Sequence, residues 1–200
     1  MKIIEPKAEL FDFVDTEAVM KKLELCGRVS HQSEPREGSA DNFVRMLIKR
    51  GHESVLEHVS LTFHIICNRA IMAELTRHRH ASFTVESTRY VKYDELTFVA
   101  PFQYNVTSFD MYPSANKVFK ATERAYKSLH DVGYSPENIR CLLPMALKSE
   151  LYMTANLRSW RHILKLRTDE AAHPQMRRIA NQILAVFKDK LPVIVEDIGK

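Results

Sequence analysis

Glycine is scarce in this sequence, with only five residues in a chain of 200. The phosphate loops of dinucleotide-binding and P-loop folds need several glycines in a short stretch, because the backbone must turn tightly and approach the phosphates closely. No stretch of this chain meets that requirement. The sequence therefore lacks both a dinucleotide fingerprint and a P-loop, and any bound nucleotide must have its phosphates held by side chains.

The apolar periodicity predicts short strands mixed with amphipathic helices. Residues 59–67 are rich in β-branched and apolar side chains, which is typical of a central strand. Pro113 and Ser114 begin a long helical pattern that Gly133 ends, with apolar positions at Val118, Ala121, Ala125 and Leu129. Further strands are expected at 1–5 and 151–154, an extended or looped segment at 83–93, and further helices over 16–26, 40–50, 68–76, from 136, 156–167 and 174–191.

These elements predict an α+β fold in which a small, mostly antiparallel sheet packs with several helices. No repeat, low-complexity segment or convincing linker interrupts the chain. Because 200 residues suit one compact domain, we expect a single domain over residues 1–200.

Composition bounds the location and the partners of the protein. No apolar run approaches the roughly 20 residues that a membrane span needs, and the first residues lack the apolar stretch of a signal peptide, so we expect a cytoplasmic protein without membrane contact. The three scattered cysteines, Cys26, Cys67 and Cys141, favour reduced, mostly buried thiols over disulfides or a zinc site. A net charge of +4 suits an anionic small molecule at least as well as a nucleic acid.

Residues 77–90 differ from the rest of the chain because they hold three arginines and two histidines against a single acid, Glu86. Clustered guanidinium groups repel one another unless an anion lies between them, and their planar fork matches phosphate oxygens. If Ser87 and Arg89 lie on an extended segment, their side chains point to the same side and could hold adjacent parts of one ligand. Composition alone would favour a solvated basic turn.

The spacing within this segment is more specific than its composition. Arg77-His78-Arg79 is followed, after seven residues, by Ser87-x-Arg89, a pattern that resembles the signature of flavin-dependent thymidylate synthases. The resemblance runs in order from about residue 40 to the C-terminus, and it includes residues 51–58, Arg140 before Leu142-Leu143-Pro144, and Asn156-Leu157-Arg158-Ser159 with the later Leu166-Arg167.

The resemblance implies an enzyme that methylates dUMP to dTMP. Methylenetetrahydrofolate would be the carbon donor, and FAD reduced by NADPH would mediate methylene transfer and reduction without a cysteine nucleophile. It also implies a thymidylate-synthase-complementing-like fold and a homotetramer with shared active sites. The odd, scattered thiols fit this chemistry, because none of them has an evident activating base.

By the same resemblance, the residues expected to bind the cofactor are His52, Ser54, Glu57, Arg77, His78, Arg79, Asn156, Arg158 and His162. Those expected to bind the nucleotide are Arg77, Glu86, Ser87, Arg89, Arg140 and Arg167. Ser87 and Arg167 are the expected catalytic residues. One guanidinium near the uracil would stabilise charge that develops on its carbonyl oxygens, and Ser87 is expected to position the substrate, since no general base for it is evident. For His162, a solvated helix face is an equally good interpretation.

Two departures from the family pattern keep other functions open. Thr84-Val85 stands where the family usually has Asn-Glu, and Ala172-His173 stands where Ala-Gln is common. A changed set of hydrogen bonds can redirect the choice of pyrimidine, so alkylation of dCMP is one alternative. A non-catalytic module that binds nucleic acid is another, although we expect no nucleic-acid partner. No metal site is expected, because His52 and His58 lie six residues apart rather than the four of a zincin helix.

Overall fold

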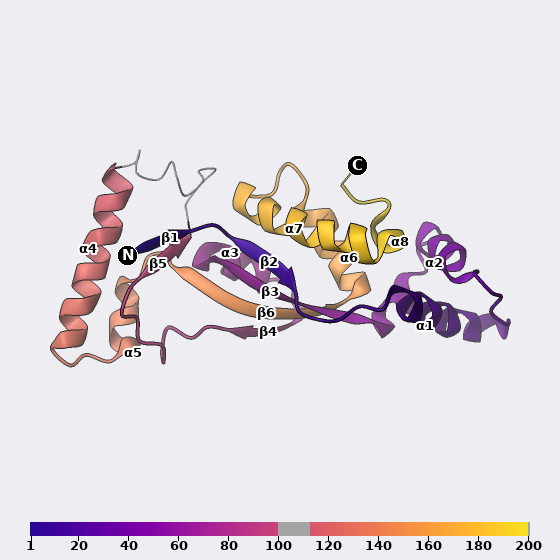
Figure 1. Ribbon diagram of the computed structural model, residues 1–200, viewed down its shortest axis with the longest axis horizontal. Helices are drawn as coiled ribbons and strands as arrows, with labels where there is room; N and C mark the ends of the chain where they lie inside the picture. Colours follow the sequence, from indigo (N-terminus) through magenta and orange to yellow (C-terminus); the bar gives the residue numbers. More distant parts are fainter. Residues whose placement is uncertain (100–112, 200) are drawn as a thin grey trace. The chain divides into compact units, whose positions relative to one another are not determined.

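The computed structural model describes residues 1–99 and 113–199 (Figure 1). The predicted start of the long helix at Pro113 lies at the edge of the second range. In chain order the elements are β1 (Lys2–Ile4), β2 (Lys7–Leu10), α1 (Thr16–Arg28), η1 (Val29–His31), α2 (Ala40–Lys49), η2 (Glu53–His58), β3 (Ser60–Asn68), α3 (Arg69–Leu75), β4 (Ser82–Val85), β5 (Thr97–Val99), α4 (Pro113–Asp131), α5 (Pro136–Ile139), η4 (Arg140–Leu142), β6 (Lys148–Asn156), α6 (Leu157–Arg167), α7 (Pro174–Lys190) and α8 (Pro192–Val195).

The strands confirm the predicted α+β class. Four strands form one small sheet in the order β2-β3-β6-β4, so the predicted central strand is central, and β1 pairs in parallel with β5. Strand β6 is longer than the predicted 151–154, because it begins at Lys148. Its first residues are polar, so the sequence pattern does not predict a strand there. Ser149 is nevertheless buried, which shows that sheet pairing outweighs local propensity at this position.

The chain forms two compact units. Unit 1 comprises Met1–Lys7, Ile65–Arg77 and Thr84–Tyr152, and unit 2 comprises Ala8–His64, His78–Phe83 and Met153–Lys200. The prediction of a single domain stays a prediction. Among the described residues, no helix is long and apolar enough to cross a membrane.

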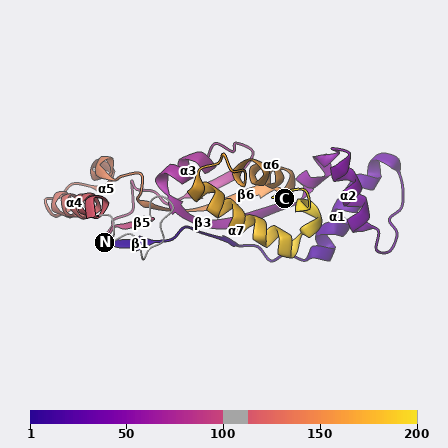
Figure 2. The same cartoon turned by 90° about the horizontal axis from the view of Figure 1, so that it is seen from above.

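The core of unit 2 is built on the helix that follows β6. The side chain of Asn156 caps α6, where its Oδ1 accepts a hydrogen bond from the backbone N–H of Ser159 at 2.8 Å. Trp160 donates from Nε1 to the carbonyl of Leu61, and its ring meets Phe63 edge-on with centroids 5.0 Å apart. Figure 2 shows α6 and α7 beside each other in this unit. The predicted core face of α6 is confirmed, since Leu157, Trp160, Ile163 and Leu164 are all buried.

The core of unit 1 corrects the predicted face of α4. Val118 is 57% exposed, and Ala121 and Ala125 are exposed as well. The buried positions are Phe119, whose ring stacks on Phe98 with centroids 4.3 Å apart, and Tyr126. Of the predicted positions only Leu129 packs against this core; the other three are exposed, because aromatic rings bury far more apolar area than alanine side chains do.

All three cysteines are free, as predicted. Cys67 is buried, and burial raises the pKa of its thiol to about 12. Cys141, however, is exposed and Cys26 is half-buried, so the expectation of mostly buried thiols was wrong. Cys141 lies in η4, where its Sγ donates to the carbonyl of Asn138 at 3.4 Å.

Candidate functional site

The basic segment begins where α3 ends and continues through β4 into a turn. Ser87 does not lie on an extended segment, because residues 88–90 form a turn in which its carbonyl accepts from the N–H groups of Tyr90 and Val91. Its hydroxyl oxygen accepts from the backbone N–H of Arg89 at 3.3 Å. The premise that placed Ser87 and Arg89 on one side of a strand is therefore wrong, and Ser87 has the local bonding of a turn serine.

Arg77 and Arg79, at the start of the segment, are exposed cations. Within residues 1–99 and 113–199, neither guanidinium makes an ion pair with an acid. Arginine donors without an acidic partner fit the oxygens of a phosphate or a diphosphate, which accept paired hydrogen bonds. This donor set is compatible with a flavin diphosphate.

His78, between these arginines, lies in unit 2 against the end of α6. The Nε–H of Arg167 donates to Nε2 of His78 at 3.0 Å. The ring of His162 meets the ring of His78 edge-on, with centroids 6.3 Å apart. Burial, followed by the charge of Arg167 and by His162, lowers the pKa of His78 to about 4. Three residues predicted from separate motifs thus form one cluster, and its histidine is neutral at physiological pH.

A second predicted pair in unit 2 joins η2 to α6. The Nη1 atom of Arg158 lies 2.6 Å from Oε1 of Glu57, and both side chains are about half exposed. An exposed pair of this kind contributes little to stability, so either partner can exchange it for a ligand at small cost. His52 and Ser54, at the start of η2, are exposed. Oδ1 of Asn156 caps α6, so this residue has a structural role in addition to the cofactor binding expected of it.

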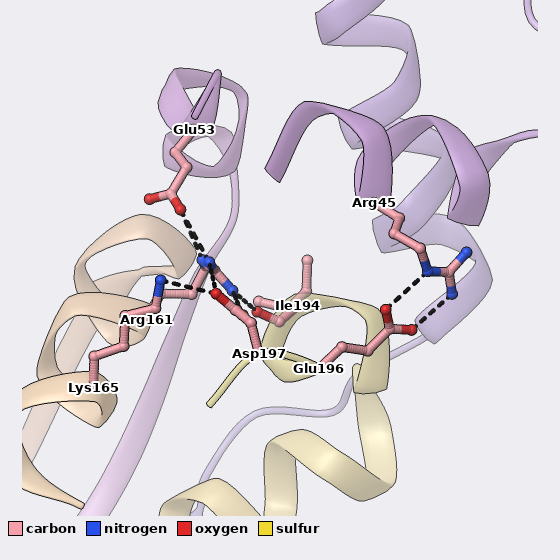
Figure 3. A network of polar contacts seen from close by, with 7 residues as sticks. All are labelled: Arg45, Glu53, Arg161, Lys165, Ile194, Glu196 and Asp197. Atoms are coloured by element: carbon pink, nitrogen blue, oxygen red, sulfur yellow. Dashed lines mark hydrogen bonds and ion pairs between the residues drawn. The ribbon is translucent and has the colours of Figure 1, made fainter. Parts of the chain in front are cut away.

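The residue that the sequence interpretation missed is Arg161. Its side chain is 1% exposed and bonds to Glu53 and to both carboxylate oxygens of Asp197, at 2.8 and 3.0 Å (Figure 3). It also donates to the carbonyl of Ile194. Hydrogen bonds from Arg161 hold the pKa of Asp197 well below its usual range. A signal was present, because position 161 falls on the apolar stripe of α6, between Leu157 and Leu164 at helical spacing.

This buried network positions η2 against α6 and the C-terminal segment. Glu53 is the first residue of η2, so its bond to Arg161 fixes the element that carries Ser54 and Glu57. At the rim, Arg45 on α2 forms a bidentate pair with Glu196. Figure 3 shows these contacts converging on the C-terminal residues from α2, η2 and α6.

In unit 1, Glu86 is committed to neighbours in the protein. Its Oε1 accepts from the hydroxyl of Tyr93 at 2.8 Å, and Nζ of Lys148 lies 2.8 Å from its Oε2. Burial and the bond to Glu86 raise the pKa of Tyr93. Glu86 therefore shapes the segment before Ser87, a role that the expectation of direct nucleotide binding did not include.

Two of the predicted nucleotide arginines of unit 1, Arg89 and Arg140, are placed by α5. Nε of Arg89 lies 2.7 Å from Oε1 of Glu137, with both side chains about half exposed. Arg140 is exposed and follows Glu137 by three residues, so it lies about one helical turn after the acid that pairs with Arg89. The predicted site residues thus fall into two groups: Arg77, Glu86, Ser87, Arg89 and Arg140 in unit 1, and the others in unit 2.

The described residues contain no group of three or more His, Cys, Asp or Glu side chains placed to hold a metal ion. His173, one of the departures from the family pattern, caps α7 by accepting from the N–H of Gln175 at its Nδ1. The substitution at this position thus has a structural role in starting the helix.

Comparisons with known proteins agree over most of the chain. A family model described as thymidylate synthase complementing protein matches residues 12–193. A probable flavin-dependent thymidylate synthase of Mycobacterium phage L5 is 32% identical over 185 residues, which cover 86% of this chain and 76% of that protein. The flavin-dependent thymidylate synthase of Corynebacterium diphtheriae is 30% identical, with coverage of 92% and 79%.

A solved structure is similar over nearly the whole chain. The crystal structure of a UMP/dUMP methylase from Streptomyces cacaoi, bound with 5-Br dUMP, matches with a TM-score of 0.83. The two chains are 27% identical, and the match covers 97% of this chain and 95% of the other. The structure of the same methylase bound with 5-Br UMP matches with a TM-score of 0.79.

Proposed function

Because the chain belongs to the thymidylate synthase complementing protein family, we propose that it methylates dUMP to dTMP with methylenetetrahydrofolate as the carbon donor, FAD as the bound cofactor and NADPH as the reductant. The observation that carries this proposal is the pair of exposed guanidinium groups of Arg77 and Arg79, which have no acidic partner in the described chain and flank a neutral histidine. Such donors suit an anionic cofactor or nucleotide.

The residues that would hold the flavin come mainly from unit 2. Arg77 and Arg79 would donate to its phosphates, and the exposed pair of Glu57 and Arg158 would exchange with its polar groups. His52, Ser54, Asn156 and His162 complete the proposed set. A bound flavin supplies the redox chemistry that the side chains lack.

The nucleotide would be held by charge and hydrogen bonds rather than by a covalent bond. Arg89 and Arg140 would bind the phosphate, and Ser87 would position the nucleotide through its hydroxyl. Arg167 would place a guanidinium near the uracil, where it stabilises charge on a carbonyl oxygen. The raised pKa of Cys67 argues against this thiol as a nucleophile, since a buried thiol stays protonated.

The comparisons favour uracil over cytosine as the base. The similar methylase was crystallised with uridine nucleotides, which supports dUMP over dCMP for this chain. A non-catalytic nucleic-acid module is disfavoured by membership of an enzyme family. We also propose a cytoplasmic homotetramer with shared active sites.

Release of tritium from the 5-position of the nucleotide tests this function, because methylation must remove that hydrogen. With FAD, NADPH and methylenetetrahydrofolate present, labelled dUMP is expected to release tritium, and labelled dCMP is expected to release none. Labelled UMP, which differs from dUMP only by its 2′-hydroxyl, is the matched comparison that tests whether the enzyme distinguishes the two sugars. Release from dCMP alone, or from no nucleotide with a flavin-loaded protein, would refute the proposal.

Arg89 offers a sharper test of nucleotide binding. Arg89→Ala is expected to weaken dUMP binding by about tenfold to a hundredfold, because a charge-assisted phosphate contact is lost. Its effect on FAD binding should be small. Glu137→Gln removes the competing carboxylate at 2.7 Å, so it is expected to leave dUMP binding equal or tighter. Calorimetric titration measures both, and equal dUMP affinity in Arg89→Ala and wild type would contradict the role.

A further inference from the structure

His78 is the central residue of the Arg77-His78-Arg79 motif, and its side chain contacts α6. Its Nε2 accepts from the Nε–H of Arg167 at 3.0 Å, across 89 residues of sequence. His162, five residues before Arg167 on the same helix, contributes the edge-on ring contact, with centroids 6.3 Å apart. The histidine ring is half-buried. A contact this specific between two predicted site residues indicates a defined role for the imidazole.

The direction of the hydrogen bond fixes the chemical state of His78. Arginine has only donors, so Nε2 must offer a lone pair, and the ring proton must reside on Nδ1. A second proton would face the positive charge of Arg167 and the ring of His162, both contributed by α6. Together with burial, these groups lower the pKa to about 4, so the hydrogen bond persists at every physiological pH.

We propose that His78 is a positioning residue for Arg167: its neutral Nε2 accepts from Nε and fixes the plane in which the guanidinium presents its terminal amino groups to the nucleotide. A free arginine side chain samples many rotamers, and ordering it in advance removes that entropic cost from binding and catalysis. The identity of the ligand as dUMP rests on the proposed function, whereas the hydrogen bond does not.

The tautomer of His78 tests the contact independently of activity. In ¹⁵N-labelled protein as purified, NMR at pH 7 is expected to show Nδ1 protonated and Nε2 as an acceptor, with a titration midpoint near 4. His80, which is exposed two residues later, supplies a reference imidazole signal in the same spectrum. A ring protonated at Nε2, or charged at pH 6, would overturn the proposal.

Substitution tests the consequence. His78→Gln keeps an acceptor near the place of Nε2, and His78→Leu removes it. We expect His78→Leu to lower kcat for tritium release by about 10- to 100-fold, and His78→Gln to stay within about threefold of wild type, since it retains the acceptor. His80→Leu should be unchanged. Equal losses in both His78 variants, or none in His78→Leu, would count against positioning. Should His78→Leu fail to fold, the tautomer and His78→Gln still decide the question.

A double substitution separates positioning from packing. If His78 acts through Arg167, then His78→Leu adds less than about twofold to the loss already caused by Arg167→Ala. Independent, multiplying losses would show that His78 acts by another route. A wild-type protein that neither binds dUMP nor releases tritium would refute the proposed function. The NMR measurement would still show whether His78 accepts the hydrogen bond from Arg167.

Discussion

Arg161→Ala is expected to lower the free energy of unfolding by about 2–5 kcal/mol, because it deletes a buried side chain that is the shared partner of two partly exposed carboxylates. The side chain is 1% exposed and satisfies Glu53, Asp197 and the carbonyl of Ile194. Its loss takes the ion-pair partner from Glu53, leaves Asp197 with Lys165 alone, and opens a cavity beside α6. Urea unfolding followed by circular dichroism, at one fixed protein concentration, measures the change.

Arg45→Ala is the matched control for this prediction. It removes an arginine from the same region, but its pair with Glu196 lies at the rim with side chains 32% and 42% exposed. We expect little change in its unfolding midpoint. If Arg161→Ala unfolds at the same urea concentration as Arg45→Ala, the buried network contributes nothing measurable and the interpretation is wrong.

The network also predicts how the stability difference between Arg161→Ala and the wild type depends on pH. The pKa of Asp197 is lowered in the folded protein, chiefly by its hydrogen bond with Arg161. Its stabilising contribution is therefore fully present above the unfolded pKa, near 3.8, and is lost as pH falls through the lower folded value. Arg161→Ala removes that contribution. The difference in free energy of unfolding between the variant and the wild type should therefore decrease as pH falls below about 4.

Arg167→Ala is expected to reduce kcat for tritium release from dUMP by about 100- to 1000-fold, the usual cost of losing a donor that stabilises transition-state charge. FAD content should change little, because the flavin phosphates are assigned to other arginines. The same substitution should raise the pKa of His78 from about 4 toward its ordinary value, since it removes the nearest positive charge. Kinetics and NMR on one sample measure both effects.

Arg177→Ala is the control for this second prediction. Arg177 lies on α7 and donates to the carbonyl of Glu170, outside the proposed site. Its loss should leave both kcat and the titration of His78 unchanged. An Arg167→Ala protein with wild-type kcat would exclude Arg167 from the reaction. An unchanged His78 pKa in that variant would contradict the electrostatic account of the cluster.

Much of the local structure was predictable because it depends on neighbours in sequence. Asp15 caps α1 through its side chain, and the helix starts near Asn68 and Asn156 are fixed by the same kind of local bond. The central strand and the buried face of α6 followed from apolar periodicity. The family also followed from sequence, because the spacing of Arg77-His78-Arg79 and Ser87-x-Arg89 is itself a sequence property.

The sequence by itself determined the α+β class, most helix starts and the family, because caps, periodicity and motif spacing are local. Tertiary structure alone decided that Arg167 bonds to His78, 89 residues away, and that Arg161 is buried among acids from η2 and the C-terminus. It also decided which face of α4 is buried. Such contacts depend on desolvation and on charges brought together by folding, and no pattern of neighbouring residues encodes those distances.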